Sequence, residues 1–251
     1  MNKFRDNVRS LKSEFPDERI AVSGGITVFH PGDPGEASRF FTLANRLGQP
    51  LFISGTGANL NPGAENLTDM IVVKTDRLNQ LVKVVEQDLY VTVGAGYPLK
   101  DLNRALEGYG LFVPHADLPY PGTTGGAAAV NIAAELNGHD LPFKKYLIKA
   151  EIVTPEGEII SPGSVCFKSV AGYDIVKIFA SSWGLLGLLV NLYLRVIPAS
   201  AREEYAGMKM KPVSRENFLN GLKVSERGSD AVYARKIKDK FDPNGILPVL
   251  S

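Results

Sequence analysis

The stretch Pro121-Gly122-Thr123-Thr124-Gly125-Gly126-Ala127-Ala128-Ala129-Val130-Asn131 carries a strong fold signal. Eight of its eleven residues are Gly, Ala or Thr, so it has little side-chain bulk and offers hydroxyl donors. Such a backbone allows an extended ligand to lie directly against it. The same composition also fits the start of a Gly/Ala-rich helix packed in a crowded core. Under either interpretation, the backbone of this stretch makes close contacts, with a ligand or with the surrounding core.

A second glycine-bearing loop, Ser54-Gly55-Thr56-Gly57-Ala58-Asn59-Leu60, follows a short apolar segment. Its small residues allow several backbone N–H groups to point into one concavity, which suits a phosphate or diphosphate. A plain turn after a strand is the alternative. The dinucleotide fingerprint G-x-G-x-x-G fails because Leu60 stands at the third glycine, and no Gly-Lys-Ser/Thr follows to make a P-loop. Together, the two loops favour a phosphate-bearing ligand.

Charge and metal-ligand content argue against several classes of partner. The 251 residues include 28 basic and 27 acidic ones, so no long-range field favours nucleic acid or an anionic membrane. The single cysteine, Cys166, predicts no internal disulfide and no cysteine-ligated cluster. His30, His115 and His139 lack metal-ligand spacing, so we expect no metal site and assign no catalytic residue. Only His115 is near a candidate loop in the sequence.

The apolar segments predict no direct membrane insertion. The start of the sequence, MNKFRDNVRSLKSEF, is charged and has the period of an amphipathic helix, unlike a signal peptide. The longest apolar run, residues 183–190, is far shorter than the ~20 residues that a membrane helix needs. We therefore expect a cytoplasmic location.

Apolar periodicity, with Gly and Pro as breaks, predicts a mixture of helices and strands. Helices are expected at residues 34–47, 98–108, 175–180 and 230–241, and strands at 51–54, 70–74, 89–94, 148–154 and 188–196, with 158–161 returning as a hairpin. Lys236, Lys238 and Lys240 are expected to form a solvated helix face. Gly94-Ala95-Gly96 lacks a third glycine and is interpreted as a tight strand end.

The other distinctive segments are Gly172-Tyr173-Asp174, Ser182-Trp183-Gly184-Leu185-Leu186-Gly187 and the apolar strand up to Pro198. Together they resemble the signature of FAD-linked oxidases related to glycolate oxidase and D-lactate dehydrogenase. The two glycine loops fall where that family has its FAD diphosphate loops, and Phe241-Asp242-Pro243-Asn244-Gly245 resembles its C-terminal motif. The resemblance covers nearly the whole chain. The run Phe167-Lys168-Ser169-Val170-Ala171-Gly172-Tyr173-Asp174 is most similar to the FAD-binding accessory subunit of bacterial glycolate oxidase.

The resemblance implies an extended FAD molecule whose diphosphate is held by backbone N–H groups of both loops. It also implies contacts from the backbone near Ile152 and Val153. Tyr173 and Trp183 are interpreted as core aromatics, with packing beside a ring of FAD as the alternative. The predicted cofactor-binding residues are Ser54, Gly55, Thr56, Gly57, Ala58, Asn59, Leu60, Pro121, Gly122, Thr123, Thr124, Gly125, Gly126, Ala129, Asn131, Ile152, Val153, Gly172 and Tyr173.

Three departures from the family pattern qualify this prediction. Ser54 stands where an arginine is usual, which removes a positive charge near the diphosphate. Ala58 stands where relatives with covalent flavin carry a histidine, so we expect non-covalent FAD. Between the strand that ends near Pro198 and the last helix, the sequence has about thirty mostly polar residues without histidine. Catalytic relatives have a substrate-binding cap domain at that place.

The implied fold is α+β: a two-lobed FAD-binding domain of the PCMH/VAO type without the substrate-binding cap domain. The domain is expected over residues 1–199, with a small lobe at about 16–95 and a larger lobe, mostly antiparallel, at about 96–199. Residues 200–251 are expected to form a short polar connection and a C-terminal helix.

A bare FAD domain would expose an apolar cofactor face, so partner subunits are expected. The resemblance implies a catalytic FAD-linked 2-hydroxy-acid oxidase subunit and an iron-sulfur electron-transfer subunit, in a complex that is peripheral to the inner membrane. The chain would then be an oxidoreductase subunit that relays electrons between them. Two alternatives stay open: a stand-alone small FAD oxidoreductase, and a flavin-free scaffold subunit of the same complex.

Overall fold

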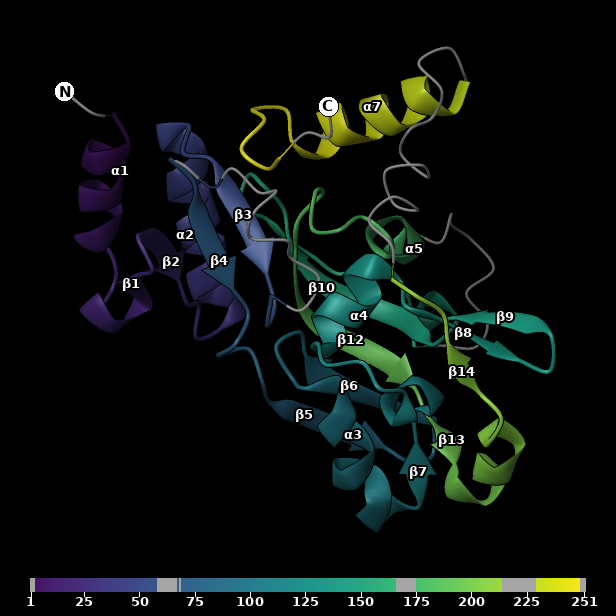
Figure 1. Ribbon diagram of the computed structural model, residues 1–251. Helices are drawn as coiled ribbons and strands as arrows, with labels where there is room; N and C mark the ends of the chain where they lie inside the picture. Colours follow the sequence, from purple (N-terminus) through teal and green to yellow (C-terminus); the bar gives the residue numbers. More distant parts are fainter. Residues whose placement is uncertain (1–2, 58–66, 68, 166–174, 214–228, 249–251) are drawn as a thin grey trace.

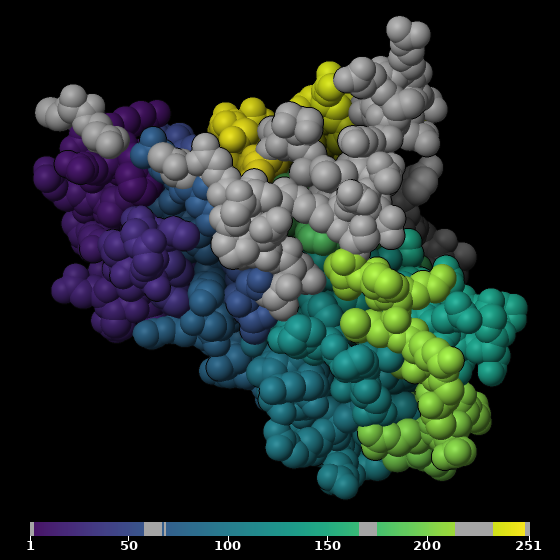
Figure 2. Space-filling view, in the orientation of Figure 1, coloured from purple at the N-terminus to yellow at the C-terminus, as the bar shows by residue number. Residues whose placement is uncertain are grey.

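The computed structural model describes residues 3–57, 67, 69–165, 175–213 and 229–248. A small N-terminal sheet with its helices lies on one side, a larger sheet occupies the centre, and the C-terminal helix crosses the top (Figure 1). The space-filling view shows the same order of N-terminal, middle and C-terminal segments over the surface (Figure 2).

A four-stranded sheet forms the N-terminal part. Its strands are β1 (Ile20–Ser23), β2 (Ile26–Phe29), β3 (Leu51–Ser54) and β4 (Ile71–Lys74), in the order β1-β2-β4-β3. β1 and β2 are antiparallel, whereas β4 is parallel to both β2 and β3. Parallel strands end at the same edge of a sheet. The residues that follow β3 and β4 therefore leave the sheet side by side.

Helices α1 (Lys3–Lys12) and α2 (Pro34–Leu47) pack apolar side chains against this sheet, and an aromatic cluster forms beside them. Phe29 stacks on Phe40 of α2 with 3.7 Å between ring centroids, and Phe15 packs edge-on against both rings at 5.2 and 5.6 Å. All three side chains are buried. Burial of one such side chain contributes about 1.5–3 kcal/mol, so this cluster holds the small sheet together.

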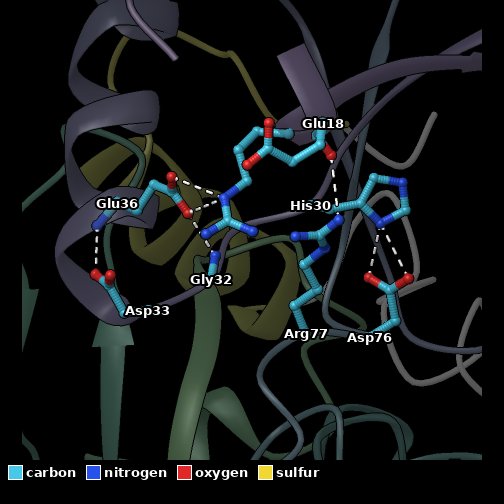
Figure 3. Close-up of polar contacts among 8 residues, drawn as sticks. Glu18, His30, Gly32, Asp33, Glu36, Asp76 and Arg77 are labelled. Carbon is cyan, nitrogen blue, oxygen red and sulfur yellow. Dashed lines mark hydrogen bonds and ion pairs between the residues drawn. The ribbon is translucent and has the colours of Figure 1, made fainter. Parts of the chain in front are cut away.

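Polar contacts fix the start of α2 (Figure 3). Asp33 is the N-cap, and its carboxylate accepts a hydrogen bond from the Glu36 N–H at 2.8 Å. The Glu36 carboxylate in turn accepts from Arg19 Nε at 2.9 Å. Nearby, His30 Nδ1 lies 2.8 Å from Asp76 Oδ1, just after β4. His30 thus joins two chain segments as a hydrogen-bonded structural residue.

The second sheet has five strands and is entirely antiparallel. Its order is β11 (Ile159–Ile160), β10 (Leu147–Val153), β12 (Leu188–Arg195), β6 (Tyr90–Gly94) and β5 (Leu81–Val85). The predicted α+β class and the predicted antiparallel character of the larger sheet are therefore confirmed. The chain passes from the small sheet to the large one between Lys74 and Leu81.

The other elements cover or connect this sheet. The helices are α3 (Leu99–Leu106), α4 (Thr124–Val130), α5 (Val176–Phe179) and α7 (Ser229–Phe241), and the 3-10 helices are η1 (Asp17–Arg19), η2 (Glu107–Tyr109), η3 (Pro114–Asp117), η4 (Phe143–Lys145) and η5 (Ala199–Tyr205). The short strands are β7 (Leu111–Phe112), which pairs with β13 (Ile197–Pro198), and β8 (Ala133–Leu136), which pairs with β9 (His139–Pro142) and β14 (Lys209–Met210). Within the described ranges, no helix combines the length and apolar character needed to cross a membrane.

The two sheets are packed against each other rather than loosely linked. Val153, Leu188 and Val190, at the adjoining ends of β10 and β12, are buried in the core of the small sheet. The turn after β10 also contacts α2, since Asn45 Nδ2 donates to the Pro155 carbonyl at 3.1 Å. The end of the large sheet nearest the small sheet is therefore held both by core packing and by a hydrogen bond to α2.

Most of the predicted elements are confirmed. α2 and β3 have the predicted bounds, and the strands expected at 70–74, 89–94, 148–154 and 188–196 correspond to β4, β6, β10 and β12 within a residue. The sequence pattern missed the hairpins β1–β2 and β8–β9 and the edge strand β5. β1, β9 and β5 are largely exposed or half-buried, so they lack the apolar alternation that marks a strand.

Candidate cofactor-binding site

The first loop leaves the small sheet at the end of β3. Ser54 is buried, and the Thr75 N–H, which follows β4, donates to the Ser54 carbonyl at 3.1 Å. Gly57 has φ 85°, a conformation that favours glycine. Within the described part of the chain, the backbone N–H groups of Gly55, Thr56 and Gly57 have no protein acceptor. Three successive donors are therefore available to an anion.

The second loop is both a helix start and a pocket wall. Thr123 is the N-cap of α4, and its Oγ1 accepts from the Gly126 N–H at 3.0 Å. The Thr124 hydroxyl donates to the Gly94 carbonyl at 2.8 Å, and the Gly125 N–H donates to the Ala95 carbonyl at 2.8 Å. The second loop is thus hydrogen-bonded to the end of β6. This close contact agrees with the predicted tight strand end at Gly94-Ala95-Gly96.

Each loop has a glycine in close contact with a neighbouring segment. A Cβ on Gly55 would lie 2.9 Å from Thr123 Oγ1, and a Cβ on Gly125 would lie 2.6 Å from Ala95 Cβ and 2.8 Å from the Ala95 carbonyl oxygen. Real Cβ contacts under 3.0 Å are essentially never seen. Gly55 thus lies against the Thr123 side chain and Gly125 lies against Ala95, and all three of Gly55, Thr123 and Gly125 line the same pocket.

A third wall comes from the turn of residues 181–187, before β12. Ser181 and Trp183 have φ values of 76° and 53°, which are uncommon for residues other than glycine. Their N–H groups donate to the carbonyls of Ala128 and Ala129 at 3.2 and 3.0 Å, which holds the turn against the end of α4. Trp183 is half-buried and faces the pocket, so its interpretation as a core aromatic is wrong.

These three walls and the residues between them enclose one pocket. The lining consists of residues 52–57 from the end of β3 and the first loop, Tyr120 with Gly122, Thr123, Gly125, Gly126, Ala129 and Val130 of the second loop, and Ser182, Trp183, Gly184, Gly187, Leu188 and Leu189 from the third wall and the start of β12, with Thr75 and Ala95 between them. The described lining holds no Asp, Glu, Lys, Arg or His side chain. Among the described residues, no group of three or more His, Cys, Asp and Glu could hold a metal ion.

Several predicted site residues lie away from this pocket. Thr124 and Asn131 do not line it, because the Thr124 hydroxyl bonds to Gly94 and Asn131 Oδ1 accepts from the Lys144 N–H at 2.9 Å. The exposed Pro121 and the fully buried Ile152 and Val153 are also absent from its walls. Ala58, Asn59, Leu60, Gly172 and Tyr173 lie outside the described residues.

Thr75 is a site residue that the sequence pattern missed. Its hydroxyl oxygen is buried, has no hydrogen-bond partner among the described residues, and belongs to a pocket-lining residue. A buried hydroxyl without a partner is unfavourable unless a ligand or water satisfies it. Only the parallel pairing of β3 and β4 brings Thr75 beside Ser54, and that pairing leaves no local sequence signal.

His115 does not line the pocket. It is fully buried, its Nε2 lies 2.8 Å from the Leu141 carbonyl oxygen, and its ring packs edge-on against Phe143 and Tyr146. Burial lowers its pKa to about 4, and the hydrogen bond to the Leu141 carbonyl only partly opposes this shift. His115 is therefore a neutral core residue, consistent with its having no assigned catalytic role.

The sequence of this chain matches one family model. Residues 26–163, more than half of the chain, match a family described as the FAD binding domain. The matched range includes both glycine loops and stops before the 181–187 turn.

Curated relatives carry the names of glycolate oxidase subunits and D-lactate dehydrogenases. The chain is 30% identical over 172 residues to glycolate oxidase subunit GlcD of Bacillus subtilis, a match covering 68% of this chain and 37% of that protein. It is 30% identical over 178 residues to D-lactate dehydrogenase of Archaeoglobus fulgidus, covering 69% and 39%. It is 28% identical over 152 residues to glycolate oxidase subunit GlcE of Escherichia coli, covering 59% and 43%. The chain spans about two fifths of the length of these relatives.

Solved structures share the fold at low sequence identity. An alkyldihydroxyacetonephosphate synthase matches with a TM-score of 0.63 and 16% identity, covering 77% of this chain and 40% of that one. The 4-ethylphenol oxidase from Gulosibacter chungangensis matches with a TM-score of 0.62 and 18% identity, covering 78% and 43%.

The pocket fits the cofactor that the family name gives. Close-packed glycine backbone at Gly55 and Gly125, available N–H groups in the first loop and the unpartnered hydroxyl of Thr75 suit a diphosphate-bearing dinucleotide. The mostly apolar third wall suits an aromatic ring of such a ligand. The chain therefore belongs to the FAD-binding domain family of the FAD-linked oxidases, and FAD is its cofactor.

Proposed function

We propose that this chain is the FAD-binding subunit of a multi-subunit oxidoreductase that acts on a 2-hydroxy acid of the glycolate or D-lactate type. In this proposal it provides an electron-relay site between a catalytic flavoprotein subunit and an iron-sulfur subunit. FAD, when bound, supplies the redox chemistry, and the chain supplies the position and polarity of the site. The names of the relatives, two of them glycolate oxidase subunits, support this assignment.

The observation that carries the proposal is the uncharged lining of the pocket. Oxidation of a 2-hydroxy acid calls for a cationic group to bind the carboxylate and for a base to accept the hydroxyl proton. The described lining offers backbone amides, hydroxyls and apolar groups but no charged side chain. Such a wall can hold a cofactor and lacks the usual groups for turning over a hydroxy acid, which favours substrate chemistry on a partner.

The connection between β13 and α7 also supports the proposal that a partner subunit oxidises the substrate. Residues 199–228 separate these elements, and the described part of that segment forms only η5 and the short strand β14. Folded domains typically need 50 or more residues, roughly. This connection is therefore too short to form a substrate-binding cap at the place where catalytic relatives are expected to have one.

Within the proposed site, the residues act through the backbone. The N–H groups of Gly55, Thr56 and Gly57 would hold the diphosphate non-covalently, with the Thr75 hydroxyl as a further donor. Trp183 would pack against a ring of the cofactor. Contacts from the remaining predicted residues (Ala58, Asn59, Leu60, Pro121, Thr124, Asn131, Ile152, Val153, Gly172 and Tyr173) stay predictions, as do the cytoplasmic location and the docking of the complex at the inner membrane.

The experiment that tests the proposal is anaerobic reduction of the bound flavin by glycolate or D-lactate. The isolated holoprotein is expected to keep its oxidised visible spectrum with either acid, although dithionite bleaches it. After co-expression with the catalytic and iron-sulfur subunits, the same acids are expected to bleach the flavin of the copurified complex. Equally fast bleaching of the isolated chain would instead identify a stand-alone oxidoreductase.

A further inference from the structure

The segment of residues 238–247, which we name the C-terminal brace, lies between two walls of the cofactor pocket. It contains the last turn of α7 and the tight turn that follows, with Gly245 at φ 63°. Figure 1 shows α7 and this turn crossing over the top of the molecule, above the small and the large sheet. The brace contacts the 181–187 turn on one side and the base of β3 on the other.

Lys238 connects the brace to the 181–187 turn. Its Nζ donates to the carbonyl oxygens of Leu185 at 2.8 Å and Leu247 at 3.2 Å, and to Asp242 Oδ2 at 2.5 Å. All three ammonium protons therefore have acceptors. The side chain is only 14% exposed, so the prediction that Lys238 belongs to a solvated helix face is wrong. Burial lowers the pKa of Lys238, and the hydrogen bond and charge of Asp242 oppose this shift.

Asp242 fixes the shape of the brace. Its carboxylate is fully buried, with Oδ1 accepting from the Ile246 N–H at 3.0 Å and Oδ2 from the Leu247 N–H at 2.9 Å. These bonds place Ile246 and Leu247 in the buried core of the small sheet. The buried carboxylate and the ammonium of Lys238 thus compensate each other while they organise the surrounding backbone.

The brace is also bonded to the strand that leads into the first loop. The Leu51 N–H, at the start of β3, donates to the Ile246 carbonyl at 2.7 Å. Asn244 Nδ2 donates to Asn45 Oδ1 of α2 at 2.8 Å. β3 is only four residues long, so the bond at Leu51 lies close to the first loop, which begins at Ser54. One segment therefore connects two pocket walls that belong to different sheets.

We propose that Lys238 is a positioning residue for FAD: through Leu185 and the Asp242 turn, it holds the 181–187 wall at a fixed separation from the first loop. The Leu185 carbonyl lies within the wall that includes Trp183 and Gly187, so loss of this bond removes the attachment of the wall to the brace and leaves only its bonds to the end of α4 among those described above. This inference rests on the proposed cofactor site. It adds a residue outside the pocket that governs the affinity of the pocket for FAD.

Calorimetric titration of the flavin-depleted full chain with FAD tests this inference. Lys238→Met is expected to raise the dissociation constant about tenfold, because the wall loses its attachment at Leu185. Lys240→Met is the matched control: Lys240 is exposed on the same helix, and its replacement is expected to leave the affinity unchanged. Lys238→Arg, which keeps the positive charge and the N–H donors, is expected to recover most of the affinity.

Two further readouts separate positioning from general stability. Asn244→Ala removes only the contact with Asn45 and buries no charge, so the variant is expected to fold while binding FAD more weakly and releasing it faster. Thermal unfolding of the FAD-free variants shows whether each is folded at the titration temperature. A folded Lys238→Met chain with wild-type affinity would overturn the positioning role. Absence of FAD binding in the wild type and in Lys240→Met would instead refute the cofactor site itself.

Discussion

A Gly125→Val variant is expected to bind FAD at least about tenfold more weakly than the wild type and to unfold at a lower temperature. Even the first side-chain carbon would lie 2.6 Å from Ala95 Cβ and 2.8 Å from the Ala95 carbonyl oxygen. The start of α4 must therefore move away from the end of β6, and the hydrogen bond from the Gly125 N–H to Ala95 is lost. Flavin content after purification and a thermal melt measure the two effects.

Gly108→Val is the matched control for this substitution. Gly108 is exposed, and a Cβ there meets no atom within 4 Å. The control is expected to keep wild-type flavin content and to lose little stability. If Gly125→Val matched the control in both respects, the close contact between the second loop and β6 would not be required for the site.

Acidification from pH 6.5 to pH 4 is expected to remove about 3 kcal/mol of folding free energy through His115 alone, at about 1.4 kcal/mol per pKa unit. Burial lowers the pKa of His115 from 6.5 to about 4. Between these values the unfolded chain binds a proton that the folded chain does not, so stability falls as the pH falls. The charged ring would lie among Phe143 and Tyr146, with Nδ1 lacking a hydrogen-bond partner among the described residues.

Urea unfolding at several pH values measures this dependence. His115→Phe is expected to be less stable at neutral pH, because the Leu141 carbonyl loses its partner, and to show a flatter dependence between pH 6.5 and 4. His139→Gln serves as the control, since His139 is exposed and its replacement is expected to leave the wild-type slope intact. A slope in His115→Phe as steep as in the wild type would assign the acid sensitivity to other groups.

The sequence predicted the elements whose signal is local. α2 has an N-cap at Asp33 and a left-handed C-cap at Gly48, so both of its ends are visible in the pattern. β12 is an almost continuous apolar run because it is central in the larger sheet and buried on both faces. Exposed strands such as β5 and β9 escaped detection because partner strands, rather than their own side chains, determine their conformation.

The sequence predicted the two glycine loops of the candidate site, but it did not predict that the 181–187 turn forms a third wall. Glycine spacing pointed to Gly55 and Gly125, whose lack of a side chain is what the packing requires. Trp183 was placed in the core because its neighbours are apolar, but it is half-buried and lines the pocket. Lys238 looked like one of three solvated lysines, and only the fold brings Leu185 and Leu247 within reach of its ammonium group.

The visible absorption spectrum of the purified full chain, alone and co-expressed with its partner subunits, tests the central claim most directly. The account predicts a yellow protein, with FAD released into the supernatant when the protein is precipitated with acid, because the pocket holds the cofactor through backbone amides and packing. Colourless protein from both preparations, with no FAD bound on titration, would contradict the account and leave a flavin-free scaffold as the better description.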